Sequence, residues 1–411
     1  MTEPPRRRRA LTNVGGAIET AGDPTEAARL AHALDVAPAG DADDDPARSH
    51  VHGFHTYPAR LHPATAARLV GAFAPPGGRV LDPFCGSGTV LVESLALGRR
   101  PLGVDLNPLA VRLARAKTRP RGPDELARLV ERAGECAAAA DARRKAKAGA
   151  SRRLPAEDVA LFEPHVLLEL DSLRAAVEGV RDDLTRLDLS LVLSAILVKL
   201  SLRRGDTTGT VAPRRTAAGA AARLFAHKAE EWAWRLAEFA GLLPAPPPLP
   251  AFVAQDDATV LRALPSGRVD AVVTSPPYAA TYDYVAHHAL RLRWLGLDPG
   301  PLARGEFGSR SAYRGLGGRD ARAVWGRQLG RFFLAAGRAL PRGGPLVLVM
   351  ADSAVAGVPL RADEVAAEVA RECGFVPVAR ASQTRPHFHG PTAAAFRTRP
   401  RAEHAILLRR A

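Results

Sequence analysis

Residues 79–89 read RVLDPFCGSGT, and this stretch decides the fold. Residues 79–82 have the pattern of a short buried strand, and a glycine-rich turn then leads into a helical pattern that begins at Thr89. A second short strand is expected at 101–105, and it ends in Asp105. Strand, helix and strand in this order predict a βαβ unit, and therefore a parallel sheet.

The same pattern of strands returns in the last third of the chain. A helix is expected at 63–73, before the first strand, and further strands are expected at 252–255, 269–274, 345–351, 375–380 and 403–409. The last two strands are joined by a loop without helical pattern. The sequence therefore predicts an α/β fold, a Rossmann-like doubly wound sheet of seven strands that ends in an antiparallel hairpin.

Changes in composition divide the chain into four parts. Residues 1–48 lack sustained apolar periodicity and are expected to form a mostly disordered leader with basic and acidic runs. Residues 49–120 and 249–411 would be the two halves of the core. Between them, residues 121–248 carry helical patterns at 124–150, 156–203 and 216–242, which predict an all-helical insertion and a candidate target-recognition region.

Charge favours a polyanionic partner without proving one. The formal net charge is +14 and the isoelectric point is near 10.6, so binding to phosphate groups would be favourable. Most of the positive charge is arginine in a chain rich in alanine, proline and glycine, which is also typical of a GC-rich genome. Nucleic-acid binding therefore stays open on composition alone.

Cysteine content and hydropathy indicate a cytoplasmic protein. The three cysteines, Cys85, Cys136 and Cys373, have neither the number nor the spacing of a disulfide framework or a zinc ribbon. The apolar run 189–198 is too short to span a bilayer, and no apolar signal-peptide core follows the basic start. No membrane association is expected.

The first βαβ unit predicts a nucleoside-binding site. An acid at the end of the second strand, Asp105, could accept both hydroxyl groups of a ribose, and the glycines of the turn allow close approach of a ligand. The dinucleotide fingerprint G-x-G-x-x-G is incomplete, and no phosphate-binding loop with the pattern G-x-x-x-x-G-K-[ST] occurs. An adenosine-containing cofactor without a pyrophosphate is therefore preferred.

Two segments resemble the motifs of a known enzyme family. Residues 82–89, DPFCGSGT, look like the first motif of the amino-methyltransferases that modify DNA, and residues 269–278, VDAVVTSPPY, resemble their catalytic motif in the form typical of cytosine-N4 enzymes. The resemblance implies S-adenosylmethionine as the cofactor, DNA as the partner, and Ser275, Pro276, Pro277 and Tyr278 as the catalytic residues. It covers about 50–118 and 250–411.

The residue types at 275–278 suit the chemistry of methyl transfer to an amine, independently of the family resemblance. An exocyclic amine is a poor nucleophile because its lone pair is delocalised into the ring, so the site must orient it. Ser275 Oγ and the Pro276 carbonyl could accept the two amine hydrogens, while Tyr278 offers a flat face for a base that has left the stack. Such a transfer depends on positioning, and it requires neither a metal nor a shifted general base.

Weaker matches complete the predicted cofactor site. Residues 55–60 resemble the segment that covers the methionine end of the cofactor, and Asp257 or Asp256 resembles the acid that contacts the adenine amine, although an acidic pair after a strand is also a common helix cap. The predicted cofactor-binding residues are Tyr57, Pro58, Arg60, Asp82, Phe84, Gly86, Gly88, Thr89, Asp105, Asn107 and Asp257.

Three further segments have a possible but less specific role. Residues 199–209 could form a loop with phosphate contacts, or simply a solvated loop. Residues 282–284, with His287 and His288, are expected on one short helix near the base, where ordinary packing explains them equally well. The histidines at 50, 52, 55 and 62 have no cysteine or carboxylate nearby in sequence, so no metal site is predicted.

Several alternatives stay open. Adenine N6 of DNA and guanine N2 of transfer RNA are modified by related enzymes, but their catalytic loops usually begin with Asp or Asn where this chain has Ser275. Cytosine C5 methylation fits poorly because no cysteine nucleophile follows Val273. A non-catalytic nucleic-acid-binding protein on the same scaffold is the alternative of another class. The recognition sequence, a restriction partner and the oligomeric state are not fixed by the sequence.

Overall fold

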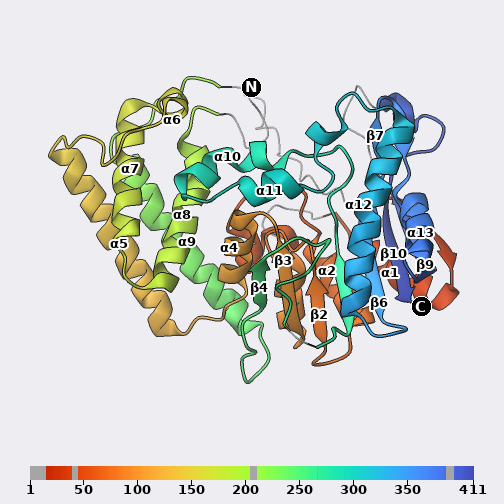
Figure 1. Cartoon of the computed structure of the whole chain (residues 1–411). Coiled ribbons are helices and arrows are strands. Elements are labelled where there is room, and N and C mark those ends of the chain that lie inside the picture. Colours follow the sequence, from red (N-terminus) through yellow and green to blue (C-terminus); the bar gives the residue numbers. More distant parts are fainter. Residues whose placement is uncertain (1–14, 39–44, 204–210, 266, 386–392) are drawn as a thin grey trace, which may run out of the picture.

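A mostly parallel sheet of eight strands forms the centre of the molecule (Figure 1). The computed structural model describes residues 15–38, 45–203, 211–265, 267–385 and 393–411. In spatial order the strands are β1 (Ile18–Gly22), β9 (Phe375–Thr384), β10 (Ala402–Arg410), β6 (Pro345–Ala351), β5 (Ala271–Thr274), β2 (Arg79–Asp82), β3 (Arg100–Asp105) and β4 (Phe252–Gln255). The predicted α/β class is confirmed.

The direction of the strands also matches the prediction. The strands β4, β3, β2, β5 and β6 pair in parallel, whereas β10 runs antiparallel between β6 and β9. Because the order reverses between β2 and β5, a crevice opens at the carboxyl ends of these two strands. A ligand site is expected at this edge.

The predicted disordered leader is wrong for part of its length. Residues 18–22 form β1, which pairs antiparallel with β9 and adds an eighth strand to the sheet. Helix α1 (Pro24–Leu34) follows, with the Asp23 side chain accepting a hydrogen bond from the Glu26 amide at its first turn. Leu30 and Ala33 are fully buried. The segments 1–14 and 39–44 lie outside the described residues.

Helices cover both faces of the sheet. Alternate residues of β6 point to opposite sides, so that Val347 and Val349 belong to one cluster while Leu346 and Leu348 belong to another. The first cluster is closed by α1 and α2 (Pro63–Phe73), and the second by α12 (Gly318–Ala339) and α13 (Ala362–Glu372). The remaining core helices are α3 (Thr89–Ala96), α4 (Pro108–Lys117), α10 (Tyr284–Trp294) and α11 (Gly300–Gly305).

Short elements complete the core. The strands β7 (Ser353–Val355) and β8 (Val358–Leu360) form a separate hairpin, and single 3₁₀ turns are η1 (Pro46–Arg48), η2 (His50–Gly53), η3 (Arg310–Tyr313) and η4 (Ala394–Phe396). Tyr284 begins α10, so Tyr282 and Asp283 precede this helix. The prediction that residues 282–284 share one helix with His287 and His288 is therefore wrong at its start.

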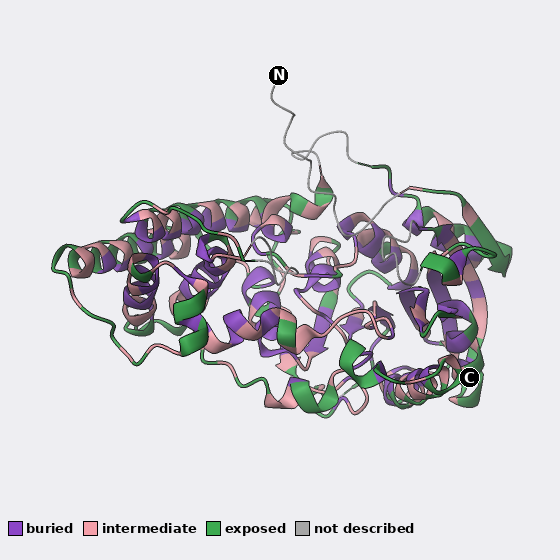
Figure 2. Ribbon diagram, turned by 90° about the horizontal axis from the view of Figure 1, so that it is seen from above, coloured by how far each residue is buried: buried purple, intermediate pink, exposed green. Residues whose placement is uncertain are grey.

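Five helices form a lobe beside the sheet, on the left of Figure 1. They are α5 (Pro123–Lys145), α6 (Ala156–Leu161), α7 (Pro164–Glu178), α8 (Asp183–Leu200) and α9 (Ala220–Gly241). Between α8 and α9 an isolated bridge joins Arg203 and Val211, while residues 204–210 of the predicted basic loop lie outside the described part. Seen from above, the buried sides of these helices turn toward one another (Figure 2).

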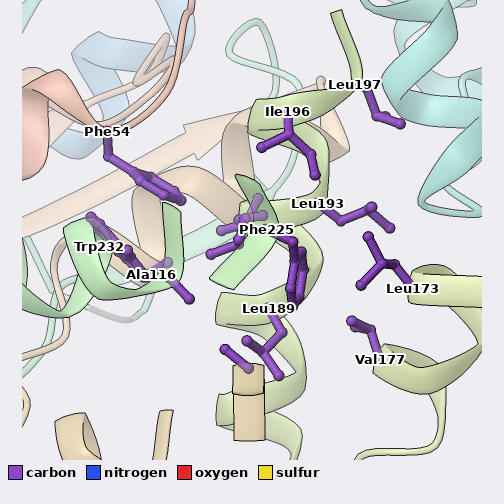
Figure 3. Packing of buried hydrophobic residues seen from close by; sticks show 14 of the residues in the cluster. Phe54, Ala116, Leu173, Val177, Leu189, Leu193, Ile196, Leu197, Phe225 and Trp232 are labelled. Carbon is purple, nitrogen blue, oxygen red and sulfur yellow. The ribbon is translucent and has the colours of Figure 1, made fainter. Parts of the chain in front are cut away.

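The helical lobe shares one hydrophobic cluster with the core. Phe54, which precedes α2, stacks on Trp232 of α9 at a centroid distance of 3.9 Å, and Ala116 of α4 belongs to the same cluster (Figure 3). Arg121 and the Trp232 indole also bind the buried Asp188 at 3.0 and 3.2 Å. The lobe is therefore packed against the core rather than hinged to it. Among the described residues no helix is long and apolar enough to cross a membrane.

Candidate functional site

A cavity lies at the carboxyl ends of β2, β3 and β5. Its empty volume is about 660 Å³, including the space open to solvent. Its walls come from segments far apart in the sequence. They are Tyr57, Ala59, Pro83, Phe84, Gly86, Asp105, Leu106, Asn107, Asp257, Ala258, Ser275, Pro277, Tyr284, Leu302, Gly305, Glu306 and Phe307. The predicted cofactor turn and the predicted catalytic loop thus face one cavity.

The glycine-rich turn has the backbone shape that only glycine adopts easily. Gly86 and Gly88 have φ angles of 49° and 88°, and a Cβ atom at Gly88 would lie 3.1 Å from the Ala114 Cα of α4. Gly88 is therefore needed for close packing of α3 and α4, whereas Gly86 lines the cavity. The turn leaves the amino end of α3 beside the space where a ligand would bind.

Asp105 is fixed by the backbone at the cavity wall. Its Oδ2 accepts a hydrogen bond of 2.9 Å from the Gly86 amide, and its Oδ1 accepts one of 2.8 Å from the Asn107 amide. Each carboxylate oxygen keeps a second lone pair for a hydroxyl group. Burial raises the pKa of Asp105 to about 6, although these two amide hydrogen bonds oppose the shift.

Asn107 and Tyr57 extend this wall. Asn107 caps α4 through a 3.0 Å hydrogen bond from the Leu109 amide to its Oδ1, and its Nδ2 donates to the Tyr57 hydroxyl at 3.3 Å. The Tyr57 ring also stacks on His288 with a centroid distance of 4.9 Å. The segment before α2 is therefore tied to both α4 and α10 at the cavity.

Asp82 does not line the cavity. It is 3% exposed, and its Oδ1 accepts hydrogen bonds from Thr274 Oγ1 at 2.6 Å and from the Phe84 amide at 3.2 Å. Burial raises the pKa of this carboxyl group to about 7. In this structure Asp82 joins the ends of β2 and β5, which is a positioning role and not a direct contact.

Three other predicted cofactor-binding residues, Thr89, Pro58 and Arg60, do not line the cavity. Thr89 lies in the first turn of α3 and is buried, while Pro58 lies between two residues that line the cavity. The Arg60 guanidinium donates to the backbone carbonyls of His52 and Ala47. These side chains support the turn and the segment 55–60, and they are not among the residues that line the cavity.

The two acidic residues that follow β4, Asp256 and Asp257, have different roles in the structure. Asp256 accepts hydrogen bonds from the amides of Asp257 and Ala263 at 2.8 and 2.7 Å, so its two oxygens hold the local turn. Asp257 lines the cavity and accepts a single hydrogen bond of 2.8 Å from the Thr259 amide. Contact of Asp257 with an adenine amine stays a prediction.

The predicted catalytic loop begins where β5 ends. Ser275 and Pro277 line the cavity, and Pro276 between them is buried. Tyr278 does not line it, because its ring packs on the cluster beneath and its hydroxyl donates to Glu403 Oε1 at 3.1 Å. Burial, together with the nearby Glu403 carboxylate, raises the pKa of Tyr278. The Tyr278 hydroxyl is therefore directed toward β10, and the ring is outside the lining of the cavity in this structure.

Sequence reasoning missed one wall of the cavity. Its residues are Leu302, Gly305, Glu306 and Phe307, which come from α11 and the turn after it and follow the predicted catalytic motif by about 25 residues. The Glu306 carboxylate accepts a hydrogen bond from the Tyr284 amide, and the Ala280 amide donates to the Gly308 carbonyl at 3.0 Å. No periodicity or motif marks this segment, and only its contacts place it at the site.

Two groups of described residues have the composition of a metal site. The structure brings Glu93 to His50 and His52, with His52 Nε2 2.7 Å from Glu93 Oε1, so a carboxylate does complete this set of histidines. Asp352, Asp363 and His404 form the second group. Arg361 and Arg399 already pair with the two aspartates of the second group. Lys117, Arg60 and Arg235 place positive charge around the first, so neither group carries a metal assignment.

Sequence comparison finds a local similarity to DNA methylases in the first half of the core. Residues 41–116 match the family model described as DNA methylase. A stretch of 82 residues is 42% identical to the Type II methyltransferase M.MvaI of Kocuria varians and covers 19% of this chain and 18% of that protein. A stretch of 68 residues is 34% identical to the Type II methyltransferase M.MjaII of Methanocaldococcus jannaschii, covering 16% and 13%. These matches confirm the resemblance to the amino-methyltransferases of DNA for this part of the chain, and that family uses S-adenosylmethionine as its cofactor.

These similarities are local. The chain spans less than a fifth of the length of the curated relatives it matches. Among solved structures, TrmN from Thermus thermophilus has a TM-score of 0.32 and 14% identity, with 85% of this chain and 49% of that chain covered. The rRNA methyltransferase aviRa from Streptomyces viridochromogenes has a TM-score of 0.34 and 16% identity, with 92% and 95% covered.

The cavity fits the cofactor of this family. It combines a carboxylate for ribose hydroxyls at Asp105, a glycine turn without a pyrophosphate loop, and apolar side chains at Leu106 and Phe307 for a flat base. These donors, acceptors and apolar surfaces suit the adenosine part of S-adenosylmethionine. The catalytic loop adjoins the same space through Ser275.

Proposed function

We propose that this chain transfers a methyl group from S-adenosylmethionine to an exocyclic amino group of a DNA base, and that the base is cytosine, methylated at N4. One observation carries the proposal. Ser275 and Pro277 of the catalytic loop line the same cavity as Gly86 and Asp105 of the cofactor turn. Methyl donor and target amine would therefore meet at the edge where β2 and β5 end.

The residues of the loop would orient the target amine. Ser275 Oγ and the Pro276 carbonyl are acceptors for its two hydrogens, which directs the nitrogen lone pair away from the ring. When bound, S-adenosylmethionine would supply the methyl group of its sulfonium: the C–N bond would form as the C–S bond breaks, the cofactor would leave as the neutral thioether, and the amine would release one proton to water. Ser275 is not required as a nucleophile in this reaction.

The structure supports the positioning by rigid elements. Two prolines restrict the loop, and Thr274 at its start is tied to Asp82 on the neighbouring strand. The amide of Ala280 is bound to the Gly308 carbonyl, so the loop is held at both ends. Such fixed geometry is what an in-line displacement needs.

Cytosine is preferred to adenine because of the first loop residue. The sequence Ser275-Pro276-Pro277-Tyr278 resembles the form typical of cytosine-N4 enzymes, whereas the related adenine enzymes usually carry Asp or Asn at the position of Ser275. The description of the matched family model, DNA methylase, supports DNA as the substrate, and the names of the relatives leave the base open.

The test is methylation of genomic DNA in cells that express this chain, with nucleosides separated by mass spectrometry. N4-methylcytosine is expected with the parent protein and not with Ser275→Ala, provided that the variant binds S-adenosylmethionine with unchanged affinity. N6-methyladenine would correct the base and keep the reaction. DNA without either modification would contradict the proposal and move the test to RNA and to binding without catalysis.

A further inference from the structure

A second hollow lies between the core and the helical lobe. Its empty volume is about 860 Å³, including its open mouth. Four arginines and two acids line it, namely Arg112, Arg115, Arg174, Arg186, Glu178 and Asp183. Cations therefore exceed carboxylates by two. They come from α4 of the core and from α7 and α8 of the lobe, so no single helix makes this site.

Arg112 is the unusual member of this group. It is half-buried, yet it makes no hydrogen bond or ion pair with any residue that the structure describes. Burial and the charges of Arg115 and Arg186 lower the pKa of its guanidinium. A half-buried cation beside two other cations, without a partner, lowers the stability of the fold.

The other arginines of the hollow are already engaged. Arg115 donates to the Val253 carbonyl at 3.0 and 2.8 Å. Arg174 binds Glu178, and Arg186 binds Asp183. The two acids are thus paired within the hollow, so the charges of Arg112 and Arg115 have no carboxylate partner among its lining residues, and only Arg112 also lacks a hydrogen bond. An incoming anion would meet Arg112 first.

A second donor without a partner belongs to the same wall. Trp294, at the end of α10, is 2% exposed, and its indole Nε1 has no hydrogen-bond partner among the described residues. A buried indole N–H usually finds an acceptor in a folded protein. The Trp294 Nε1 atom is buried beneath the surface of the hollow, so the unpaired donor that faces the hollow is the Arg112 guanidinium, which suits a ligand that has only acceptors, as a phosphate group does.

The hollow is connected to the cofactor cavity by two helices. Asn107 caps α4 at the cavity, and Arg112 lies five residues further along, or about 8 Å along the helix axis. Helix α10 begins with Tyr284 in the cavity wall and ends with Trp294 in the hollow. A polymer bound at the catalytic edge could therefore place a phosphate group in this hollow.

We propose that the hollow between α4, α7 and α8 is a phosphate-binding site, with Arg112 as its central ligand. The source that we favour is a phosphodiester of the DNA backbone, and this choice of source rests on the proposed function. A free phosphate-bearing molecule has the same chemistry, and the experiment separates the two. The site would position the helical lobe on the substrate without reading its sequence.

The test compares Arg112→Gln with the parent chain in binding a labelled random-sequence duplex of about 30 base pairs, in the absence of cofactor. Each phosphate contact contributes close to one unit to the dependence of log Kd on log salt concentration. Arg112→Gln is therefore expected to reduce this slope by about one and to raise Kd about tenfold at low salt. Because Arg112 makes no hydrogen bond or ion pair with the residues that the structure describes, the melting temperature should be unchanged or higher.

Two control variants separate the site from general charge. Arg112→Lys keeps the cation and should retain most of the affinity and the salt slope. Arg371→Gln removes an exposed cation at the end of α13, near the edge where β9 begins, and should leave the slope unchanged. Equal slopes for Arg112→Gln and the parent, together with equal binding of inorganic phosphate by calorimetry, would overturn the proposal.

The remaining outcomes distinguish the ligand and the reaction. Loss of inorganic phosphate binding in Arg112→Gln with an unchanged DNA slope would keep the phosphate site and reject the DNA backbone as its source. If Arg112→Gln reduces the salt slope of DNA binding but the parent protein methylates no DNA, the phosphate-binding site is supported and the proposed methyl transfer is contradicted. The binding measurement needs no turnover, so the two proposals can fail separately.

Discussion

Thr274 Oγ1 donates a hydrogen bond of 2.6 Å to Asp82 Oδ1 and thereby joins the carboxyl end of β5 to that of β2. The bond connects the last residue before the catalytic loop with the first residue of the cofactor turn. Both residues are buried, with exposed fractions of 0% and 3%. The distance between the two halves of the site therefore depends on this pair.

Replacing Thr274 by valine should weaken both stability and cofactor binding. The variant keeps the shape of the side chain but leaves the buried Asp82 carboxyl group with one donor fewer, which costs about 1–3 kcal/mol. Urea unfolding and calorimetry with S-adenosylmethionine measure the two effects. Thr259→Val is the matched control, because the buried Thr259 hydroxyl has no partner among the described residues and its loss should cost little. Equal stabilities for the two variants would contradict this role.

Affinity for S-adenosylmethionine should increase as pH rises from 5 to 7. The pKa of Asp105 is raised to about 6, and the ionised carboxylate is the stronger acceptor for ribose hydroxyls. If only that form binds well, Kd at pH 5 should be up to about tenfold weaker than at pH 7. For folding the sign is opposite, since a raised carboxyl pKa means that this group's contribution to stability is lost as pH rises toward 6.

Asp105→Asn is the control for this pH dependence. The variant keeps an acceptor oxygen but does not titrate, so its binding should be weaker and constant across the same range. Calorimetry at matched ionic strength measures both proteins. A parent affinity that is constant from pH 5 to pH 7 would contradict the assignment of Asp105 to the cofactor.

Gly305 lines the cavity on the side formed by α11, and a side chain at this position would reduce the space in the cavity. A Cβ atom there would lie 2.9 Å from Leu106 Cδ1 and 4.0 Å from Asp257 Oδ2. Gly305→Ala should therefore raise Kd for S-adenosylmethionine several-fold while the melting temperature changes little. Gly71→Ala on α2 is the control for the same substitution, because its Cβ would meet no atom within 4 Å and alanine favours a helix. Unchanged binding in Gly305→Ala would remove α11 from the cofactor site.

Strong local patterns explain which parts of the structure could be predicted. Each strand of the predicted parallel sheet is a short apolar run, and the acid or tetrapeptide that follows it necessarily lies at the carboxyl edge of that sheet. This geometry puts Asp105 and Ser275 at the same edge of the sheet. The cavity that contains both of them follows from the order of the strands.

Long-range contacts explain what could not be predicted. Strand β1 is a five-residue edge strand that is mostly exposed, and it exists because β9 pairs with it. Helix α1 does have apolar residues at Ala27, Leu30 and Leu34, but the Pro- and Arg-rich surroundings hid this spacing. The wall at 302–307 has no pattern at all, and the orientation of Tyr278 depends on Glu403 of a distant strand.

Tyr278 tests whether the catalytic loop acts on the base or on the cofactor. Its ring is outside the lining of the cavity, so Tyr278→Ala should leave the Kd of S-adenosylmethionine unchanged. If the tyrosine stacks on the extruded base, the variant should lower the transfer rate about 10- to 100-fold, as expected for a lost stacking contact. Tyr278→Phe keeps the ring and loses only the hydrogen bond to Glu403, which Arg385 still pairs at 2.9 Å, so its rate should fall only a few-fold. Equal rates for the alanine and phenylalanine variants would show that the hydroxyl group, and not the ring, is what this position contributes.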